Sequence, residues 1–419
     1  MMPNAQALYD FSPVLQLMLL GTVLAALPLG WVWLRNRKAS ASQRLKALAL
    51  VTLFLTFDLV LFGAFTRLTD SGLGCPDWPG CYGQASPVGA RAQISAEQAA
   101  MPTGPVTHSK AWIEMIHRYL ASGVGVLIVA MLVGTWLQRK SATFAERKLS
   151  LWLPSVTLLW VCIQGAFGAL TVTMKLFPAI VTLHLLGGMV LLALLQAQAS
   201  GYASYTQINT LQTQDEINVM QSIRRLAILG FALLFLQIAL GGWVSTNYAV
   251  LACTEFPMCQ GQWLPDMNLQ QGFSLWRPLG KLTDGQNISL AGLTAIHVVH
   301  RVFAFVLFAV LGLLAWRLYR NGLKRSAWAI VGLLLWQLCT GLANVVLGWP
   351  LLAAVSHTGG AAGLVLVMTA LLLRSAPAAQ ATGAAMKQSQ LPQQSAMPSA
   401  SQNSNPIPYQ RPTKAAASP

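Results

Sequence analysis

The chain has 419 residues, of which 55% are hydrophobic and only 9% are charged. Soluble domains carry roughly 25% charged residues, so this composition excludes a soluble globular protein and indicates a membrane protein. A net charge of +15 would suggest a nucleic-acid partner in a soluble chain, but the basic residues collect beside apolar segments, and we therefore expect a lipid bilayer and no nucleic acid.

Nine apolar stretches are long enough to cross a hydrocarbon core of about 30 Å as helices. They span residues 12–34, 46–66, 111–137, 149–173, 178–200, 223–246, 291–316, 326–348 and 350–373. The first stretch has no counterpart elsewhere in the chain, whereas the other eight form two similar sets of four. The predicted fold class is an all-α polytopic membrane protein, with two tandem four-helix bundle repeats and one extra N-terminal transmembrane helix.

Basic residues indicate the orientation of these helices. They collect in four connections, which all fall on one side of the membrane in a nine-helix topology: residues 35–46, 139–148, 224–225 and 317–325. By the positive-inside rule this side is cytoplasmic, which places the N-terminus outside and the C-terminus inside. No basic residue precedes Arg35, so the N-terminus does not resemble a cleaved signal or transit peptide. We expect a multi-pass protein of a bacterial inner (plasma) membrane.

These features divide the chain into five parts. The predicted boundaries are 1–45 for the extra helix and a cytoplasmic loop, 46–200 for the N-terminal four-helix half, 201–222 for a cytoplasmic linker, 223–374 for the C-terminal four-helix half and 375–419 for a cytoplasmic tail. The tail consists mostly of Ala, Gln, Ser and Pro with few charges and few large apolar residues, so we expect it to be disordered.

Four histidines occur in two matched pairs. His117 and His300 each precede an arginine at the head of a long apolar stretch and are 183 residues apart. His184 and His357 are 173 residues apart, and each is followed within four residues by a pair of glycines. The same offset of 173 relates two further pairs: Gln164 with Gln337 and Gly168 with Gly341. This pattern indicates an internal duplication.

All four histidines are expected at a similar depth in the membrane. Their positions along the apolar stretches place the imidazoles roughly 9 to 14 Å from the outer end, at 1.5 Å per helical residue. Two imidazoles at matched depth on neighbouring helices can supply both axial nitrogens to an iron porphyrin. A lone intramembrane histidine more often forms an inter-helix hydrogen bond, but two repeated pairs favour one haem in each half. Zinc is a weaker alternative, because its sites usually require three or four ligands in one cluster.

Residues next to these histidines have two interpretations each. Arg118 and Arg301 directly follow ligand candidates near the outer boundary, where they would bind haem propionates or instead extend to lipid headgroups. The glycine pairs at 187–188 and 359–360 suit either the close approach of a flat ring to a helix backbone or ordinary packing between helices.

One acidic residue breaks the symmetry between the halves. Glu114 lies one helical turn before His117 and thus on the same helix face, whereas His297 occupies the equivalent position in the second half. Buried carboxylates are costly in a membrane and are by default functional. We therefore interpret Glu114 as a catalytic or proton-handling group that points toward the edge of a porphyrin. The alternative is a salt bridge to Arg118 or Lys110.

Two cysteine pairs share one spacing. Cys75 with Cys81 and Cys253 with Cys259 each enclose five residues that include a proline, in loops on the outer side. That compartment is oxidising, so both pairs are most simply disulfides that staple loops. The first pair has a second, catalytic interpretation, because it belongs to the half with Glu114. An exposed, strained disulfide there would take part in redox exchange or substrate capture.

The sequence resembles haem A synthases, a family with bacterial and mitochondrial members, over about residues 46–374. The resemblance rests on Gly-Ala-Phe-Thr-Arg-Leu-Thr-Asp-Ser-Gly-Leu at residues 63–73, the motif from Glu114 to Arg118, His184 with its glycine pair, His300-Arg301, and Ser356-His357-Thr358-Gly359-Gly360. It implies a membrane oxidase that converts haem O to haem A. Such an enzyme oxidises the C8 methyl group of the porphyrin to a formyl group through two successive hydroxylations and loss of water.

The resemblance also implies a division of labour between the halves. His117 and His184 would flank the substrate haem O, His300 and His357 would ligate a haem b, and Glu114 would serve the oxidation. Implied partners are a haem O synthase and the assembly route of haem-copper oxidases, while the sequence does not identify the electron donor or acceptor. The first helix and the tail fall outside the eight-helix core to which the resemblance extends.

Two other functions fit parts of the pattern. A dihaem b-type cytochrome that only transfers electrons would bind two haems of one type permanently and form no product. A membrane thiol oxidase would depend on Cys75 and Cys81 rather than on His300.

Overall fold

A computed structural model describes residues 12–141, 150–203 and 214–375 of the protein. Parts of several sequence-based predictions lie outside these ranges. They are the segments 142–149 and 204–213 of two predicted cytoplasmic connections, and nearly all of the predicted tail, from residue 376 onward.

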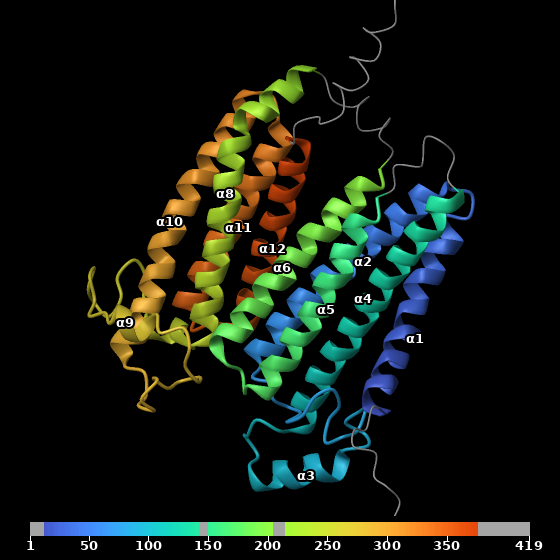
Figure 1. Cartoon of the computed structure of the whole chain (residues 1–419). Helices are drawn as coiled ribbons and strands as arrows, with labels where there is room; N and C mark the ends of the chain where they lie inside the picture. The colour runs from blue at the N-terminus through green and yellow to red at the C-terminus, as the bar shows by residue number, and fades with distance from the viewer. Residues whose placement is uncertain (1–11, 142–149, 204–213, 376–419) are drawn as a thin grey trace, which may run out of the picture. The chain divides into compact units, whose positions relative to one another are not determined.

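Within the described residues, nine helices are long and apolar enough to cross a membrane (Figure 1). Their bounds are α1 Ser12–Arg35, α2 Ala41–Leu68, α4 His108–Ser141, α5 Trp152–Thr173, α6 Pro178–Gly201, α8 Gln214–Thr246, α10 Leu290–Arg320, α11 Lys324–Val346 and α12 Leu351–Arg374. Each coincides with one predicted apolar stretch, and the largest difference is at α8, which begins at Gln214 instead of residue 223. The predicted class of an all-α polytopic membrane protein is confirmed, while the tandem repeat stays a prediction.

Local sequence signals explain several helix ends. At the start of α2, the Ser40 side chain accepts a hydrogen bond from the Gln43 amide, and the Gln43 side chain accepts one from the Ser40 amide. This capping box satisfies two backbone donors that lack partners within the helix. Pro178 occupies the first turn of α6, where its fixed φ and missing N–H are tolerated. Ser289 caps α10 by accepting a hydrogen bond from the Gly292 amide at 3.1 Å.

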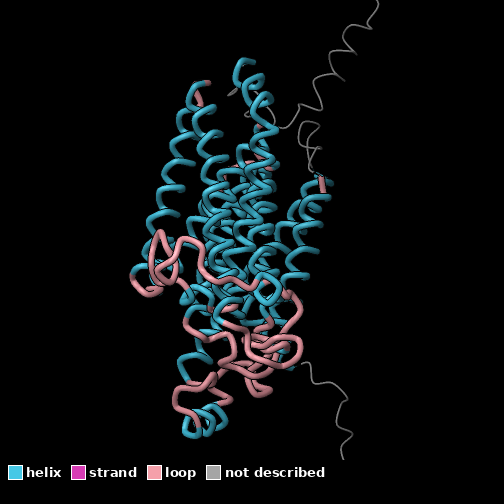
Figure 2. The backbone as a smooth tube through the Cα atoms, turned by 90° about the vertical axis from the view of Figure 1, so that its left-hand side faces the viewer, coloured by secondary structure: helices cyan, strands magenta, loops and turns pink. Residues whose placement is uncertain are grey.

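The long connections gather at one end of the helix bundle (Figure 2). We call this end the outer end, following the predicted orientation. The connection between α2 and α4 contains the short helix α3 (Arg91–Ala100). The connection between α8 and α10 contains the 3-10 turn η1 (Ala249–Ala252) and the one-turn helix α9 (Leu269–Gly272). The sequence analysis did not predict these elements, because each is much shorter than the apolar stretches that mark a membrane span.

Each set of four core helices packs in the same cyclic order. In the first set α2 and α5 each contact α4 and α6, and in the second set α8 and α11 each contact α10 and α12. The two sets join through α6 and α12, with further contacts between α6 and α8 and between α2 and α12 (Figure 1). A shared apolar core that includes Leu48, Leu192, Leu311 and Met368 runs through both sets. Lipid tails are as apolar as these side chains, so close packing rather than transfer from water holds the helices together.

Helix α1 packs on the first set only, mainly against α4. A Cβ added to Gly21 would lie 2.7 Å from the Cβ of Ser122, so a glycine is required for this close approach. Nearer the outer end, Leu17 of α1 is buried in one cluster with Met115 of α4 and the disulfide of the following loop. The extra helix therefore supports the outer loop of the first half.

The equivalent face of α10 is open. Val302, Phe305 and Val306 are exposed by 58%, 63% and 46%. In the first half, the equivalent residues of α4 are Tyr119, Ser122 and Gly123. Each lies 183 positions earlier in the chain, the same distance that separates His117 from His300. Two small residues, Ser122 and Gly123, thus occur where α1 docks, and large apolar residues occur at the equivalent positions where the second half faces outward.

We expect Gly21→Leu to destabilise the protein by about 1–3 kcal/mol, the usual cost of overpacking, because the added side chain would separate α1 from α4. Gly30→Leu on the same helix is the matched control, since no atom lies within 4 Å of a Cβ added there. Thermal unfolding of the detergent-purified proteins measures the difference. Equal midpoints for the two variants would contradict the described packing of α1.

Candidate functional site

Each of the four predicted ligand histidines faces a glycine on the preceding long helix. A Cβ added to that glycine would lie 3.0 to 3.5 Å from the nearest imidazole atom in all four cases. The pairs are His117 on α4 with Gly63 on α2, His184 on α6 with Gly168 on α5, His300 on α10 with Gly241 on α8, and His357 on α12 with Gly341 on α11. A side chain at Gly63 or Gly241 would crowd the ring, whereas a Cβ at Gly168 or Gly341 would make an ordinary contact with it. The glycines thus let the helices approach closely beside each imidazole.

The histidines also meet in the predicted pairs. The His117 imidazole interacts electrostatically with His184, and the His300 imidazole interacts with His357. All four side chains are half-buried, whereas His297, the equivalent of Glu114, is only 3% exposed. The two members of each pair are therefore close enough to influence each other, and each residue is partly accessible.

Hydrogen bonds orient the imidazoles of the second half. Thr340 donates its hydroxyl hydrogen to the Trp336 carbonyl at 2.7 Å, so its oxygen accepts from His357 Nδ1–H at 2.9 Å. This leaves His357 Nε2 with a free lone pair, the tautomer that a metal ligand requires. Gln237 Nε2 lies 3.1 Å from His300 Nδ1 and donates to the His300 carbonyl at 3.2 Å.

The donor atoms fit an iron porphyrin in each half. Haem iron takes two axial imidazoles from facing helices, and each half supplies two. In the first half, His184 Nδ1 is buried without a hydrogen-bond partner among the described residues. A buried polar atom without a partner costs free energy unless a ligand or water satisfies it. The pairing and the tautomer of His357 are therefore compatible with a ligand that binds imidazole nitrogens.

The glycine pairs after His184 and His357 serve helix packing. A Cβ on Gly187 would lie 1.7 Å from the Gln164 amide nitrogen, and one on Gly360 would lie 2.9 Å from the Gln337 amide nitrogen. The two glutamines, which the sequence analysis matched at one offset, therefore fill the space beside these glycines. A side chain of the neighbouring helix, and not a flat ring, occupies this space.

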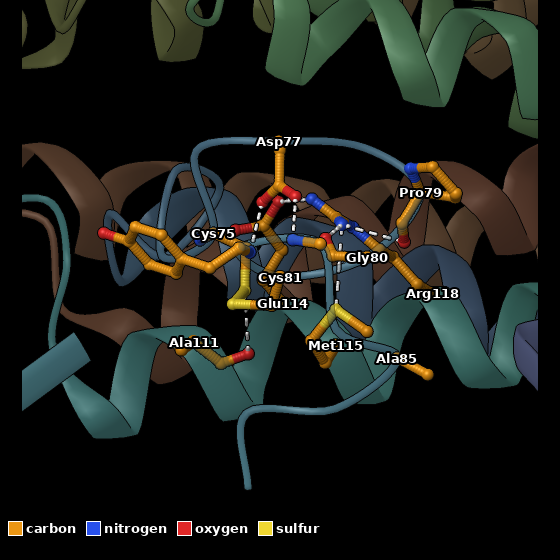
Figure 3. Close-up of a disulfide and its surroundings, with 12 residues drawn as sticks. Cys75, Asp77, Pro79, Gly80, Cys81, Ala85, Ala111, Glu114, Met115 and Arg118 are labelled. Atoms are coloured by element: carbon orange, nitrogen blue, oxygen red, sulfur yellow. Dashed lines mark hydrogen bonds and ion pairs between the residues drawn. A yellow bond between two sulfur atoms is a disulfide. The ribbon is translucent and has the colours of Figure 1, made fainter. Parts of the chain in front are cut away.

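Glu114 lies beneath the outer loop of the first half and is 4% exposed (Figure 3). Its Oε2 atom accepts a hydrogen bond from the Cys75 amide at 2.8 Å, and its Oε1 atom accepts from Arg118 in a buried ion pair. Arg118 also donates to the carbonyls of Pro79 and Gly80 at 3.2 and 2.5 Å. The carboxylate thus points to the loop that carries the first disulfide, whereas the sequence analysis expected it to point toward a porphyrin edge.

The salt bridge that was the alternative role of Glu114 is therefore present in the structure. Its partner is Arg118 and not Lys110, whose amine donates to the Gly104 carbonyl at 3.0 Å. Removal of one partner from such a buried pair typically costs about 3–5 kcal/mol, because a charge is left uncompensated. The pair consequently fixes α4 to the loop. The catalytic role of Glu114 stays a prediction.

Both arginines that were predicted to bind propionates hold outer loops. Arg118 is 8% exposed, and its contacts with Glu114 and the loop carbonyls engage both terminal nitrogens. Arg301 donates to the carbonyls of Met258 and Cys253 at 3.2 and 3.0 Å. Either guanidinium would have to give up or share these bonds to bind a propionate, so that role stays a prediction for both residues.

The structure joins Cys75 to Cys81 and Cys253 to Cys259. The catalytic interpretation of the first pair assumed an exposed disulfide. This premise is wrong, because Cys75 and Cys81 have no exposed surface and pack against Leu17 and other apolar residues. The burial favours the interpretation of the disulfide as a staple of the loop.

Several residues around the histidines were missed by the sequence analysis. Gly63 and Gly241 are 178 residues apart, so a comparison of the first helix in each half would have aligned them. Thr340 and Gln237 precede Gly341 and Gly241 by one and four residues, which places them near the same imidazoles. No local pattern marks a threonine or a glutamine in an apolar helix as a histidine partner.

The fold and the site together define a polytopic membrane protein with two histidines in each set of four helices that lie close enough to influence each other. Residues 46–369 match the family model of cytochrome oxidase assembly proteins, COX15-CtaA. The chain is 39% identical to a heme A synthase of Shewanella oneidensis over 319 residues. These residues make up 76% of this chain and 92% of the relative.

Two further relatives carry the same name. A heme A synthase of Caulobacter sp. is 27% identical over 354 residues, 78% of this chain and 96% of its own length. One from Halalkalibacterium halodurans is 26% identical over 311 residues, 71% of this chain and 86% of its own length. The chain therefore belongs to the haem A synthase family of cytochrome oxidase assembly proteins, as the resemblance indicated. The matched region begins after α1.

We expect Arg118→Lys to loosen the first outer loop, because a lysine cannot contact Glu114 and the two loop carbonyls in the same fixed geometry. The loss of charge-assisted hydrogen bonds worth about 1.5–3 kcal/mol should accelerate reduction of the Cys75–Cys81 disulfide roughly 10- to 100-fold. Alkylation followed by mass spectrometry measures the rate. Arg301→Lys is the control and should accelerate reduction at Cys253–Cys259 instead. An unchanged rate at Cys75–Cys81 would show that Arg118 does not hold the loop.

Proposed function

We propose that the protein is a haem A synthase, a membrane oxidoreductase that oxidises the C8 methyl group of haem O to a formyl group. The similarity to relatives of that name supports the class of enzyme. The observation that carries the proposal is the difference between the two histidine pairs. A buried carboxylate, Glu114, accompanies the first pair, whereas a histidine, His297, occupies the equivalent position beside the second pair.

In this proposal the first half binds the substrate. His117 and His184 would hold haem O between α4 and α6, with Gly63 and Gly168 beside their rings. In the substrate, the methyl group becomes a hydroxymethyl group and then a geminal diol, which loses water to give the formyl group. Each hydroxylation adds an oxygen atom from water and releases two electrons and two protons, so the site needs a proton acceptor and a route for electrons.

Glu114 would be the proton acceptor. A carboxylate oxygen has two lone pairs, and the structure engages Oε2 with the Cys75 amide and Oε1 with Arg118. With the Gly74 amide as a third donor, one of the four lone pairs of the carboxylate remains for a proton. These donors stabilise the ionised carboxylate between transfers, and the apolar surroundings strengthen their effect.

The second half would bind a haem b through His300 and His357. When bound, haem b supplies a redox centre that carries the electrons removed from the substrate. Thr340 holds the His357 ring so that Nε2 faces the ligand space, and Gln237 contacts the His300 ring. These contacts keep the imidazoles in position for ligation.

We place the protein in the inner membrane of a bacterium, with the N-terminus outside and the C-terminus in the cytoplasm. The distribution of basic residues in the sequence supports this orientation. A haem O synthase would supply the substrate, and the assembly of haem-copper oxidases would consume the product. The electron donor or acceptor lies outside this chain.

Haem extraction from cells that make haem O tests the proposal. Cells with the protein should contain haem A, and cells without it should not. The absence of haem A in both would contradict the proposal. Two unmodified haems of one type on the purified protein, with no haem A, would instead favour the dihaem cytochrome.

We expect Glu114→Gln to retain the haem b spectrum and to lower haem A formation about 100-fold or more, the usual effect of removing a general base. Glutamine has nearly the same shape and can still accept from the Cys75 amide, but it cannot take up the proton. Glu97→Gln, at an exposed site on α3, is the control. Conversion at the normal rate in Glu114→Gln would make Glu114 a structural acid.

Thr340→Val should weaken haem b binding by about 10- to 100-fold, the typical effect of losing the hydrogen bond behind a metal ligand. His357→Ala should abolish the haem b absorption altogether. The control is Thr369→Val on α12, where the threonine hydroxyl bonds only to its own helix at 2.7 Å. Titration of the purified apoprotein with haem, followed by absorption, measures both effects. Retention of the full haem b signal in His357→Ala would show that the ligand pair is assigned wrongly.

A further inference from the structure

Arg67 belongs to the motif at residues 63–73 but takes no part in the sites described above. It lies at the end of α2, and its side chain is 12% exposed. Its guanidinium donates through Nη2 to the Ser245 carbonyl at 2.8 Å and through Nη1 to the Tyr248 hydroxyl at 3.0 Å. It also forms an ion pair with Asp70 at 3.3 Å. Arg67 therefore joins the outer end of α2 to the outer end of α8 in the other half.

Tyr248 completes this contact. The Arg67 guanidinium carbon lies 4.2 Å from the centroid of the Tyr248 ring, and the Tyr248 hydroxyl donates to Asp70. Burial raises the pKa of the Tyr248 hydroxyl, an effect that Arg67 opposes, so the hydroxyl stays protonated at neutral pH and remains a donor. The ring also meets Trp349 edge-on, with centroids 6.2 Å apart, directly before α12.

The residues in this contact occupy equivalent positions in the two halves. Arg67 and Ser245 are 178 residues apart, and so are Asp70 and Tyr248. Equivalent residues of two similar units meet each other only near the axis that relates the units. The first half supplies a cation and an acid to this contact, and the second half supplies a backbone carbonyl and a phenol. The two sides are therefore chemically complementary.

The contact is one helical turn from both histidine sites. Gly63, which faces His117, lies one turn before Arg67 on α2. Gly241, which faces His300, lies one turn before Ser245 on α8. The Ser245 carbonyl accepts the hydrogen bond from Arg67. One turn corresponds to about 6 Å along each helix. Arg67 thus connects the two helices against which these imidazoles pack.

We propose that Arg67 is a positioning residue that couples the two histidine sites, by fixing the outer end of α2 against the outer end of α8. The inference rests on the proposed function, because it assumes a haem in each half. The Ser245 carbonyl lies in the last turn of α8, where no partner exists within the helix and a cation is favourable. The contact therefore forms without a ligand. A shift of His117 against Gly63 on substrate binding passes through Arg67 to α8 and reaches His300.

The test measures the midpoint potential of haem b in the full-length protein, with and without haem O. The Glu114→Gln background keeps haem O from being consumed. Addition of haem O should shift the midpoint potential of haem b in this background. The same shift is expected when the control substitution Arg91→Ala is added to it, because Arg91 is an exposed basic residue in the loop between α2 and α4. With Arg67→Ala, the haem b content and spectrum should be retained while the shift is lost. With Glu114 restored, Arg67→Ala should lower haem A formation about 2- to 30-fold, the range that altered coupling produces.

Two further variants separate positioning from support of the fold. Arg67→Lys keeps the charge without the planar fork, so it should restore part of the shift. Tyr248→Phe should reduce the shift, and combining it with Arg67→Ala should add nothing, because both act through one contact.

An unchanged shift in Arg67→Ala, or no shift in the background protein, overturns the proposal. Loss of haem b itself from both Arg67 variants also overturns it, because Arg67 would then only support the fold. Failure of the proposed function is a separate result, seen as an absence of haem A with the unmodified protein.

Discussion

The positions of the four histidines depend on one kind of contact, an imidazole packed against a glycine of the neighbouring helix. Apolar side chains gain little by leaving lipid, so membrane helices associate where small residues let their backbones approach. Gly63, Gly168, Gly241 and Gly341 allow this approach beside each histidine. These contacts hold each ring in a defined place, which a pair of axial ligands requires.

The two halves share this arrangement but differ in the groups around it. In the first half, an ion pair ties α4 to the disulfide loop through Glu114 and Arg118. In the second half, His297 Nδ1 lies 3.0 Å from the Ala249 carbonyl, and Arg301 donates to the carbonyls of Met258 and Cys253. A buried carboxylate thus stands beside one histidine pair only. Two similar bundles can therefore hold similar ligands and still treat them differently.

The membrane spans and the histidine pairs could be predicted from the sequence, because apolar length and repeated spacing are local signals. The partners of Glu114 could not, since helix periodicity gives the face of a residue but not what lies opposite, and Cys75 is 39 residues away. Likewise, no local pattern joins Arg67 to Tyr248, 181 residues further on. The short helices of the outer loops were missed for a related reason, because their ends are set by loop packing and not by an apolar repeat.

Helix α1 gives the two halves different surroundings. It covers α4 where Ser122 and Gly123 allow close packing, while the equivalent part of α10 presents Val302 and Phe305 at the protein surface. In a bilayer, acyl chains therefore touch the helix of the second histidine pair directly, whereas a layer of protein shields the helix of the first. A change in bilayer thickness or fluidity therefore acts directly on this face of α10, and it reaches the equivalent face of α4 only through α1.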